Sequence, residues 1–308
     1  MVCALRKSAI KPNHARRYGN RRAFLVIIPA TTHDINIMSK RLSAFSYYGG
    51  KNSKLDWLLP QLETPHRTYC ELFAGSLAVM LNKSRVKHEV VNDLAGEIVS
   101  FWTALRDHRD EFINKIMDSP PGEAEFKRII SLPPTDDVME TGRRFYIRIT
   151  QAFSGVPTRK HHSFGKALRH NNVRDNLTEV ANRLRGVLIE NTDACRLMTR
   201  VINNHRYEDE SVLFYADPPY VAATRQDMDI YIHDEFNHDE FLGAVLDAPD
   251  FCKFAISGYD NQLYNSTLAD WHRVELETQL IVRNNGKRRT EVLWLNYEPS
   301  AMKQSHLL

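Results

Sequence analysis

Apolar residues along the chain alternate between short continuous runs and stretches with helical spacing, beginning near residue 52. The short runs predict buried strands over residues 68–73, 88–92, 187–190, 212–216 and 253–257. Apolar residues three or four positions apart predict helices between them, over residues 53–62, 77–83, 194–203 and 239–247. Strands that alternate with helices are typical of an α/β fold with a mostly parallel sheet.

Two regions depart from this alternation. Residues 96 to about 185 have a mostly helical pattern, and their large apolar residues recur at helical spacings, namely Phe101, Trp102, Leu105, Phe112, Ile113 and Ile116. Near the C-terminus, residues 273–282 and 290–297 flank Asn284-Asn285-Gly286, which predicts a β-hairpin. We therefore expect one α/β domain, residues 42–95 and 186–300, with a helical insertion over residues 96–185 between its second and third strands.

Composition is ordinary for a soluble globular protein. The 308 residues are 43% hydrophobic and 26% charged, and they suit one large domain with an insertion or two domains. The longest apolar run near the N-terminus, residues 24–28, is far too short to span a membrane.

The net charge of +3 is unevenly distributed. Residues 1–41 hold nine Lys/Arg against Asp34 alone, a charge of +8, which leaves −5 for the rest of the chain. Such a segment is typical of a targeting peptide or a nucleic-acid arm. We expect instead a basic, unstructured N-terminal extension, for which translation from a start upstream of Met38 is one explanation.

Cysteine and histidine spacing favours neither disulfides nor metal. The four cysteines lie far apart and form no Cys-x-x-Cys: Cys3, Cys70, Cys195 and Cys252. The adjacent His161 and His162 point apart on any regular element, so they do not share a metal. A reduced, cytoplasmic protein without a metal is therefore expected.

The most informative motif is Asp217-Pro218-Pro219-Tyr220, which follows the predicted strand over residues 212–216. The prolines end the strand and fix the local backbone. The Asp217 carboxylate and the Pro218 carbonyl are adjacent acceptors, which suits an NH₂ group, and Tyr220 offers a flat face to the ring that carries it. The motif thus predicts a site for an aromatic amine.

A second motif, residues 69–79, is a strand that enters a small-residue turn containing Gly75 and then a helix. Small residues there allow a ligand to approach the backbone and the helix N-terminus. Asp93 follows the next strand and is placed either to accept ribose hydroxyls or to cap a helix.

Two further segments add to this edge of the sheet. Residues 45–51 place two aromatics and Gly49-Gly50 before Lys51, and residues 190–193 end the third predicted strand at Asp193. Three acids at successive strand ends, Asp93, Asp193 and Asp217, favour a ligand crevice over chance helix capping.

A basic stretch predicts the polyanion site. Residues 142–174 contain no acid but eight Lys/Arg, namely Arg143, Arg144, Arg148, Arg159, Lys160, Lys166, Arg169 and Arg174. A solvated helix face normally mixes both signs, so we interpret the stretch as a nucleic-acid surface. A smaller basic cluster occurs in the predicted hairpin, at Arg283, Lys287, Arg288 and Arg289.

In this order, the motifs resemble the Dam-like DNA adenine N6-methyltransferases over roughly residues 45–298. The resemblance implies a Rossmann-like fold that uses S-adenosyl-L-methionine, with direct methyl transfer to a flipped adenine of double-stranded DNA. It implies that the insertion recognises the target, and that a monomer acts. A cognate restriction endonuclease as partner is left open, as are stand-alone and phage-encoded roles and the recognition sequence.

The resemblance also assigns roles to positions. It implies that the catalytic residues are Asp217, Pro218, Pro219 and Tyr220. It implies that the cofactor-binding residues are Tyr47, Gly49, Gly50, Lys51, Glu71, Phe73, Ala74, Gly75, Asp93 and Asp193. Together with charge, it predicts DNA contacts by Arg143, Arg144, Arg148, Phe153, Arg159, Lys160, Lys166, Arg169 and Arg288. Phe153 fits equally a wedge between bases and a core residue. The chain departs from the family at Leu77, where a second glycine is common.

Several alternatives remain open on the sequence alone. Related methyltransferases that act on cytosine N4 tend to carry Ser-Pro-Pro, and those that act on protein glutamine carry Asn-Pro-Pro-Tyr. Asp217 therefore favours adenine over both. An enzyme acting on RNA adenine, or an inactive DNA-binding protein on a methyltransferase scaffold, is the remaining alternative.

Overall fold

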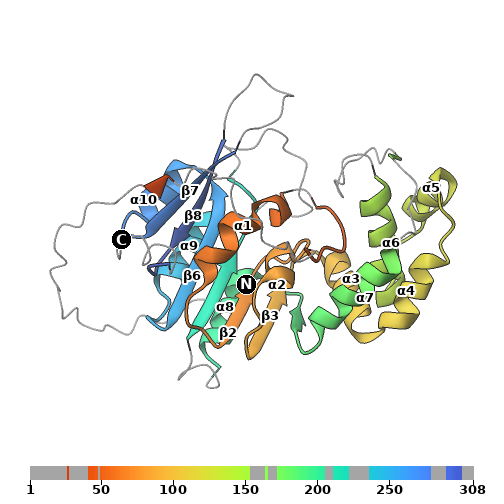
Figure 1. Ribbon diagram of the computed structural model, residues 1–308, viewed down its shortest axis with the longest axis horizontal. Helices are drawn as coiled ribbons and strands as arrows, with labels where there is room; N and C mark the ends of the chain where they lie inside the picture. Colours follow the sequence, from red (N-terminus) through yellow and green to blue (C-terminus); the bar gives the residue numbers. More distant parts are fainter. Residues whose placement is uncertain are drawn as a thin grey trace, which may run out of the picture.

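The computed structural model describes residues 26–27, 41–47, 49–152, 164–165, 172–204, 211–221, 236–278 and 289–299. Within these residues the strands form one eight-stranded sheet in the order β1-β7-β8-β6-β5-β2-β3-β4 (Figure 1). The strands are β1 Val26–Ile27, β2 Thr68–Glu71, β3 His88–Asn92, β4 Leu188–Glu190, β5 Val212–Ala216, β6 Cys252–Tyr259, β7 His272–Thr278 and β8 Arg289–Leu295.

The strand order is that of a doubly wound nucleotide-binding sheet. Counted from β2, it reads 3-2-1-4-5-7-6, because β8 inserts antiparallel between β6 and β7. The neighbours β2 and β5 are parallel, and the chain leaves them toward opposite edges of the sheet. This switch point opens a crevice at the carboxyl ends of the two strands, where ligands bind in such folds.

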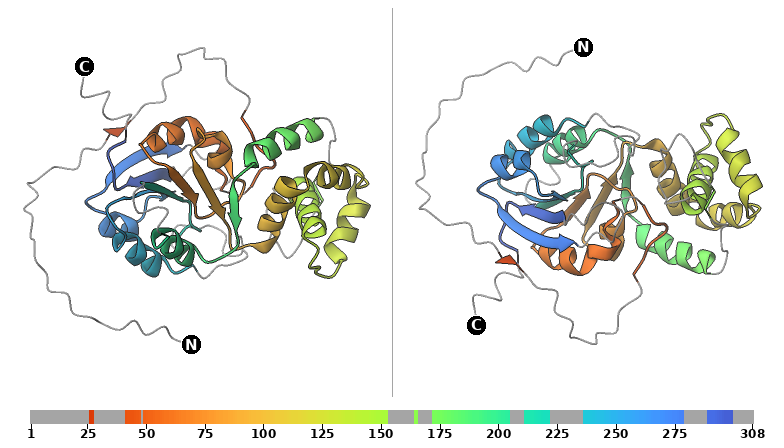
Figure 2. Two further views of the ribbon diagram at one scale, coloured as in Figure 1. Left: turned by 90° about the horizontal axis from the view of Figure 1, so that it is seen from below. Right: turned by 90° about the horizontal axis from the view of Figure 1, so that it is seen from above.

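Helices cover both faces of the sheet, which is seen edge-on between two layers in Figure 2. Along β5 the side chains alternate: Leu213 and Tyr215 pack in one buried cluster with α1 (Leu55–Leu58) and α2 (Ala78–Asn82). Val212, Phe214 and Ala216 pack in the other, with α8 (Ala194–Ile202) and α9 (His238–Leu246). A strand buried on both faces explains the continuous apolar run in the sequence.

The first predicted helix is broken into three short pieces. Residues 53–62 belong to η1 (Lys51–Lys54), α1 and η2 (Leu59–Leu62) rather than to one helix. Pro60 lies at the start of η2, and its ring removes the N–H that a continuous helix would use. The prediction of one helix was wrong here, and α10 (Gln262–Thr267) and β1 were missed.

The stretch between β3 and β4 forms a lobe of helices beside the sheet (Figure 1). These helices are α3 Gly96–Asp107, α4 Arg109–Met117, α5 Glu123–Ser131, α6 Val138–Gln151 and α7 Val173–Leu184. Gly142 lets α6 approach α3 closely, since a Cβ there would lie 2.8 Å from the Phe101 Cα. Phe45 packs against Phe101, Trp102 and Phe145, with ring centroids 5.2–5.4 Å apart, so the lobe is continuous with the core beneath the sheet.

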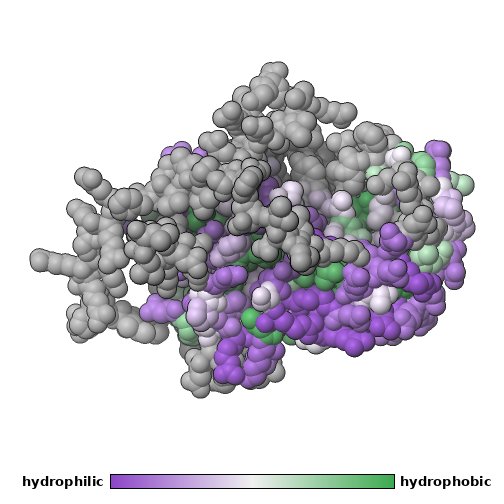
Figure 3. All heavy atoms as spheres, viewed as in Figure 1, coloured by the Kyte–Doolittle hydropathy of each residue, from purple (hydrophilic) through white to green (hydrophobic). Residues whose placement is uncertain are grey.

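The exposed face of these helices is hydrophilic, as the space-filling view shows (Figure 3). Its charges are of both signs and largely paired with neighbours, for example Arg109 with Asp110 and Lys127 with Glu123. Exposed pairs of this kind contribute little to stability, about 0–1 kcal/mol each.

Candidate active site

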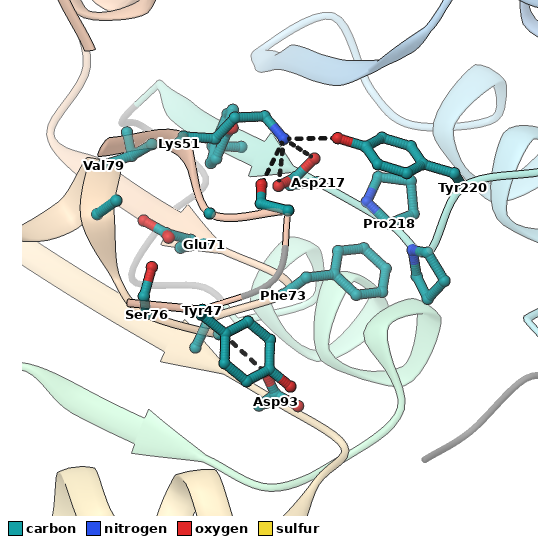
Figure 4. A pocket seen from close by; sticks show the side chains of 17 residues that line it. Tyr47, Lys51, Glu71, Phe73, Ser76, Val79, Asp93, Asp217, Pro218 and Tyr220 are labelled. Carbon is teal, nitrogen blue, oxygen red and sulfur yellow. Dashed lines mark hydrogen bonds and ion pairs between the residues drawn. The ribbon is translucent and has the colours of Figure 1, made fainter. Parts of the chain in front are cut away.

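A pocket with an empty volume of about 700 Å³ opens at the switch point between β2 and β5 (Figure 4). Thirteen of the fourteen predicted cofactor and catalytic residues line it, and Asp193 is the exception. The lining residues are Tyr47, Gly49, Gly50, Lys51, Glu71, Phe73, Ala74, Gly75, Ser76, Ala78, Val79, Asp93, Tyr215, Asp217, Pro218, Pro219 and Tyr220. The sheet topology therefore brings together segments separated by more than a hundred residues.

A tight turn presents the N-terminal motif to this pocket. The Gly50 N–H donates to the Tyr47 carbonyl at 3.0 Å, and Gly49 has φ of +75°. A positive φ at this turn position strongly favours glycine. A Cβ on Gly50 would lie 3.0 Å from the Tyr47 oxygen, so the second glycine is needed for space. The two glycines aim Lys51, which begins η1, into the site.

The glycine turn after β2 is held by Asp93. The Gly75 N–H donates to Asp93 Oδ2 at 2.8 Å, and the Ala95 N–H donates to Oδ1 at 2.9 Å. The indole N–H of Trp102, on α3, donates to the Gly75 carbonyl at 3.0 Å. Asp93 therefore orders the turn and caps the next segment. A carboxylate has about four acceptor positions, so it can accept from several groups at once.

Glu71 lies at the end of β2 and is only 2% exposed. Its Oε2 accepts from the Tyr69 hydroxyl at 2.7 Å and from the Met80 N–H at 3.0 Å. Burial raises the pKa of Glu71 to about 8, although both hydrogen bonds oppose the shift. Near neutral pH the carboxyl is therefore largely protonated, and it can donate a hydrogen bond into the pocket.

At the other end of the pocket, Lys51 pairs with Asp217. The Lys51 Nζ lies 2.6 Å from each oxygen of the Asp217 carboxylate, and it contacts the Tyr220 hydroxyl at 3.2 Å (Figure 4). Burial lowers the pKa of Lys51, but the nearby Asp217, Tyr220 and Glu291 outweigh it, so the pKa lies well above its usual value. Lys51 is therefore an ammonium at every physiological pH.

Ser257 on β6 supports Asp217 from the side. Its hydroxyl donates to Asp217 Oδ1 at 3.0 Å, and the Tyr215 hydroxyl lies 2.9 Å from the same Ser257 oxygen. Burial is the largest influence on Asp217 and raises the pKa of its carboxyl, which Lys51 and Ser257 oppose. Among the described residues, no donor reaches the Pro218 carbonyl. Asp217 is held in one position beside it.

Tyr220 is more enclosed than a simple stacking platform. The residue is 9% exposed, and its ring packs on Tyr259 with centroids 4.3 Å apart. Tyr220 also borders a second, smaller hollow with Pro219, His238 and Tyr259. A base that stacks on Tyr220 must use the ring face that Tyr259 does not cover.

Leu77, the departure from the family pattern, lies outside the pocket lining. It caps α2 in the left-handed conformation, with φ of +52°, and its side chain is fully buried in the core. The backbone thus has the geometry that glycine favours. The side chain faces away from the ligand, so it does not restrict the pocket.

Restoring a glycine at Leu77 is expected to destabilise the protein. Removing a buried leucine costs about 2–5 kcal/mol. Relief of left-handed strain returns only about 1–2 kcal/mol. Urea unfolding should therefore show Leu77→Gly less stable than wild type. Asn172→Gly is the matched control, because Asn172 has φ of +67° and an exposed side chain, and it should leave stability nearly unchanged. A Leu77→Gly protein as stable as wild type would contradict this balance.

Asp193 is placed at the N-cap of α8, where its side chain accepts from the Arg196 N–H at 3.0 Å. It borders a shallow surface depression with Cys195 and Glu240. The structure therefore does not bring it together with the other predicted cofactor residues. A role near the cofactor's adenine stays a prediction.

The predicted DNA-contacting arginines of α6 have internal partners. Arg143 is 6% exposed and bonds Glu140 at 2.7 Å and Ser119 at 2.9 Å. Arg144 bonds Glu140 at 2.8 Å, and Arg148 pairs with Glu97 on α3. In this conformation Arg143 stabilises the helical lobe and is not presented to a phosphate. Other predicted contacts lie outside the described residues, namely Phe153, Arg159, Lys160, Lys166, Arg169 and Arg288.

Sequence reasoning missed the residues that support the site from η1, α3, β6 and β8, which are Lys54, Trp102, Ser257, Tyr259 and Glu291. Only Glu291 carried a signal. An acid directly before Val292-Leu293-Trp294-Leu295, in a strand apolar on both faces, is unusual unless it has a buried partner.

A doubly wound sheet with an antiparallel strand between β6 and β7, and with the Asp-Pro-Pro-Tyr and glycine turns at its switch point, defines a Rossmann-like methyltransferase. Residues 47–280 match the family described as D12 class N6 adenine-specific DNA methyltransferase. The match covers well over half of the chain, so the chain belongs to this family and is an adenine-specific DNA methyltransferase. The predictions of fold class and family are confirmed.

Among solved structures, the chain is similar to the rRNA methyltransferase AviRa from Streptomyces viridochromogenes. The identity is 12%, over 80% of this chain and 83% of that one, and the TM-score is 0.32. A similarity at this score carries no argument about substrate. No curated protein sequence matches the chain.

Neither a membrane span nor a metal cluster occurs in the described part of the chain. None of the helices there has the length and apolar character needed to cross a bilayer. The same residues contain no group of three or more His, Cys, Asp or Glu side chains that could hold a metal ion.

Proposed function

We propose that the protein transfers the methyl group of S-adenosyl-L-methionine to N6 of an adenine extruded from double-stranded DNA at a specific site. The observation that carries this proposal is the convergence of Asp217 and Pro218 on one end of the pocket at the switch point. Two acceptors there suit the two N–H bonds of an exocyclic amine.

The pocket residues fit S-adenosyl-L-methionine. Gly75 and Gly50 keep the backbone accessible, Asp93 has acceptor capacity for ribose hydroxyls, and Phe73 and Tyr47 supply apolar surface for a base. When bound, this group supplies an electrophilic methyl. Asp93, Gly75 and Phe73 would hold its nucleoside portion.

Asp217 and Pro218 perform the part of the reaction that the protein contributes. The lone pair of adenine N6 is delocalised into the ring, so the nitrogen is a weak nucleophile. Acceptors on both N–H bonds favour a pyramidal nitrogen and stabilise the positive charge that develops on it during attack. Lys51 and Ser257 hold the carboxylate in place, so little reorganisation is needed in the transition state.

The adenine must leave the duplex to reach the pocket, since a stacked base cannot approach Asp217. Extrusion costs a few kcal/mol. Stacking on an aromatic ring returns about 1–3 kcal/mol. The ring face of Tyr220 opposite Tyr259 and the adjacent Pro219 are the surfaces that we propose for such contact.

The test is transfer of tritiated methyl groups to duplex DNA, single-stranded DNA and RNA, followed by nucleoside analysis. We expect N6-methyladenine in duplex DNA, confined to one sequence context when the methylated sites are sequenced. Methylcytosine as the sole product, or labelling of RNA alone, would overturn the proposal. An intact fold that does not bind S-adenosyl-L-methionine would favour a DNA-binding protein without activity.

A further inference from the structure

A buried acid from the last strand lies directly behind the catalytic motif. Glu291, on β8, is fully buried, and its side chain contacts Lys51, Lys54 and Tyr220. Its Oε1 lies 3.2 Å from the Lys51 Nζ and 3.4 Å from the Tyr220 hydroxyl. Its Oε2 accepts a hydrogen bond from Lys54. A carboxylate is rarely buried so completely unless partners balance its charge.

Four charged side chains form a network of ion pairs behind the motif. Two ammonium groups, Lys51 and Lys54, face two carboxylates, Asp217 and Glu291, so the set is neutral. Lys54 is satisfied by Glu291, which leaves Lys51 to bridge both acids. The Lys51 Nζ thus lies between Asp217, which touches the substrate amine in the proposed reaction, and Glu291, which does not.

We propose that Glu291 is a positioning residue for methyl transfer, which acts through Lys51 and Tyr220 to fix the Asp217 carboxylate. The inference rests on the proposed function. Glu291 lines no part of the pocket and touches no reacting atom. It holds Lys51 and Tyr220 in place as a clamp, so that Asp217 presents its oxygens in one orientation.

The charges around Lys51 make the clamp sensitive to pH. The titratable groups that face Lys51 are Asp217, Tyr220 and Tyr215 from β5 and the motif after it, Glu291 from β8 and Lys54 from η1. Glu291 is among the groups that raise the pKa of Lys51. Loss of its charge lowers that pKa, so Lys51 becomes neutral at a lower pH and Asp217 loses its partner there.

The test compares kcat as a function of pH in Glu291→Gln and wild type. We expect kcat to fall by about 10- to 100-fold, with the KM for S-adenosyl-L-methionine little changed. The alkaline limb of the profile should move to lower pH. Glu291→Asp keeps the charge, and it should restore the position of the limb even though its shorter side chain leaves kcat below wild type.

A second variant separates positioning from simple stability. The double variant Glu291→Gln with Lys54→Met removes one charge of each sign, and it should recover much of the melting temperature that Glu291→Gln loses. kcat should stay low, because Lys51 and Tyr220 still lack their contact with Glu291. Recovery of both the melting temperature and kcat would assign Glu291 a structural role only and overturn the inference.

A measurement that needs no turnover tests the role of Glu291 independently of the proposed function. The Lys51 Cε resonance, in protein labelled with ¹³C-lysine and assigned with Lys51→Met, reports titration of Lys51 directly. We expect it to titrate at lower pH in Glu291→Gln than in wild type. If wild type methylated no nucleic acid, the proposed function would fail while this titration still tested the clamp. An unchanged Lys51 titration would overturn the clamp alone.

Discussion

Asp217→Asn is expected to reduce the rate of methyl transfer by about 10³-fold while the protein still binds S-adenosyl-L-methionine. The amide matches the carboxylate in size but lacks its charge, and only one of its two polar atoms accepts a hydrogen bond. Positive charge develops on the adenine nitrogen in the transition state, so the loss falls on kcat rather than on binding. Single-turnover assays on duplex DNA measure the rate, and calorimetry measures cofactor affinity.

The control is the same change, aspartate to asparagine, at a surface position. Asp247 is the C-cap residue of α9, is exposed, and does not line the pocket. Asp247→Asn should transfer methyl groups at the wild-type rate. Asp217→Asn also leaves Lys51 with Glu291 as its only acidic partner among the described residues, so melting curves must show that the variant is folded at the assay temperature. A folded Asp217→Asn protein with more than about a tenth of wild-type kcat would contradict the assigned role.

The sequence was sufficient to predict the catalytic motif because its constraints are local. An apolar run buried on both faces, followed by two prolines, defines a strand end whatever the rest of the chain does. The strand alternation then implies that Asp93, Gly75 and Asp217 meet at one edge of the sheet, and the structure places them in one pocket. At this site the local sequence pattern and the topology of the sheet lead to the same prediction.

The same reasoning could not separate an acid that lines the pocket from an acid that only caps a helix. Asp193 follows a strand just as Asp93 does, but its carboxylate accepts the Arg196 N–H at the start of α8. Asp93 bonds two backbone N–H groups and still lines the pocket. Both residues are acids that follow a predicted strand. Only the three-dimensional path of the chain after each strand distinguishes them.

Charge counted along the sequence could not reveal the ion pairs of α6 for a related reason. The stretch from residue 142 to 174 has no acid, yet Arg143 and Arg148 are paired with Glu140, just before it, and with Glu97 on α3. Helix packing supplies partners that a window cannot contain. Glu291 is a further example, since its partner Lys54 lies 237 positions earlier in the chain.

Asp93→Asn is expected to weaken binding of S-adenosylhomocysteine by about 10- to 100-fold. Hydrogen bonds to a charged group contribute about 1.5–3 kcal/mol each, and the amide can replace only some of the acceptors that hold Gly75, Ala95 and a ribose. Calorimetry gives the affinity. The loss alone does not show which role it removes, since a loosened Gly75 turn would also weaken binding.

A thermodynamic cycle with 2′-deoxy-S-adenosylhomocysteine separates the two roles of Asp93. If the carboxylate accepts the ribose hydroxyl, removing that hydroxyl should weaken binding to wild type by about 10-fold and should have little further effect on Asp93→Asn. If Asp93 only orders the turn at Gly75, the two changes act through different contacts and their free energies should add. Additivity within about 0.5 kcal/mol would therefore reject the ribose contact and leave Asp93 as a support for the glycine turn.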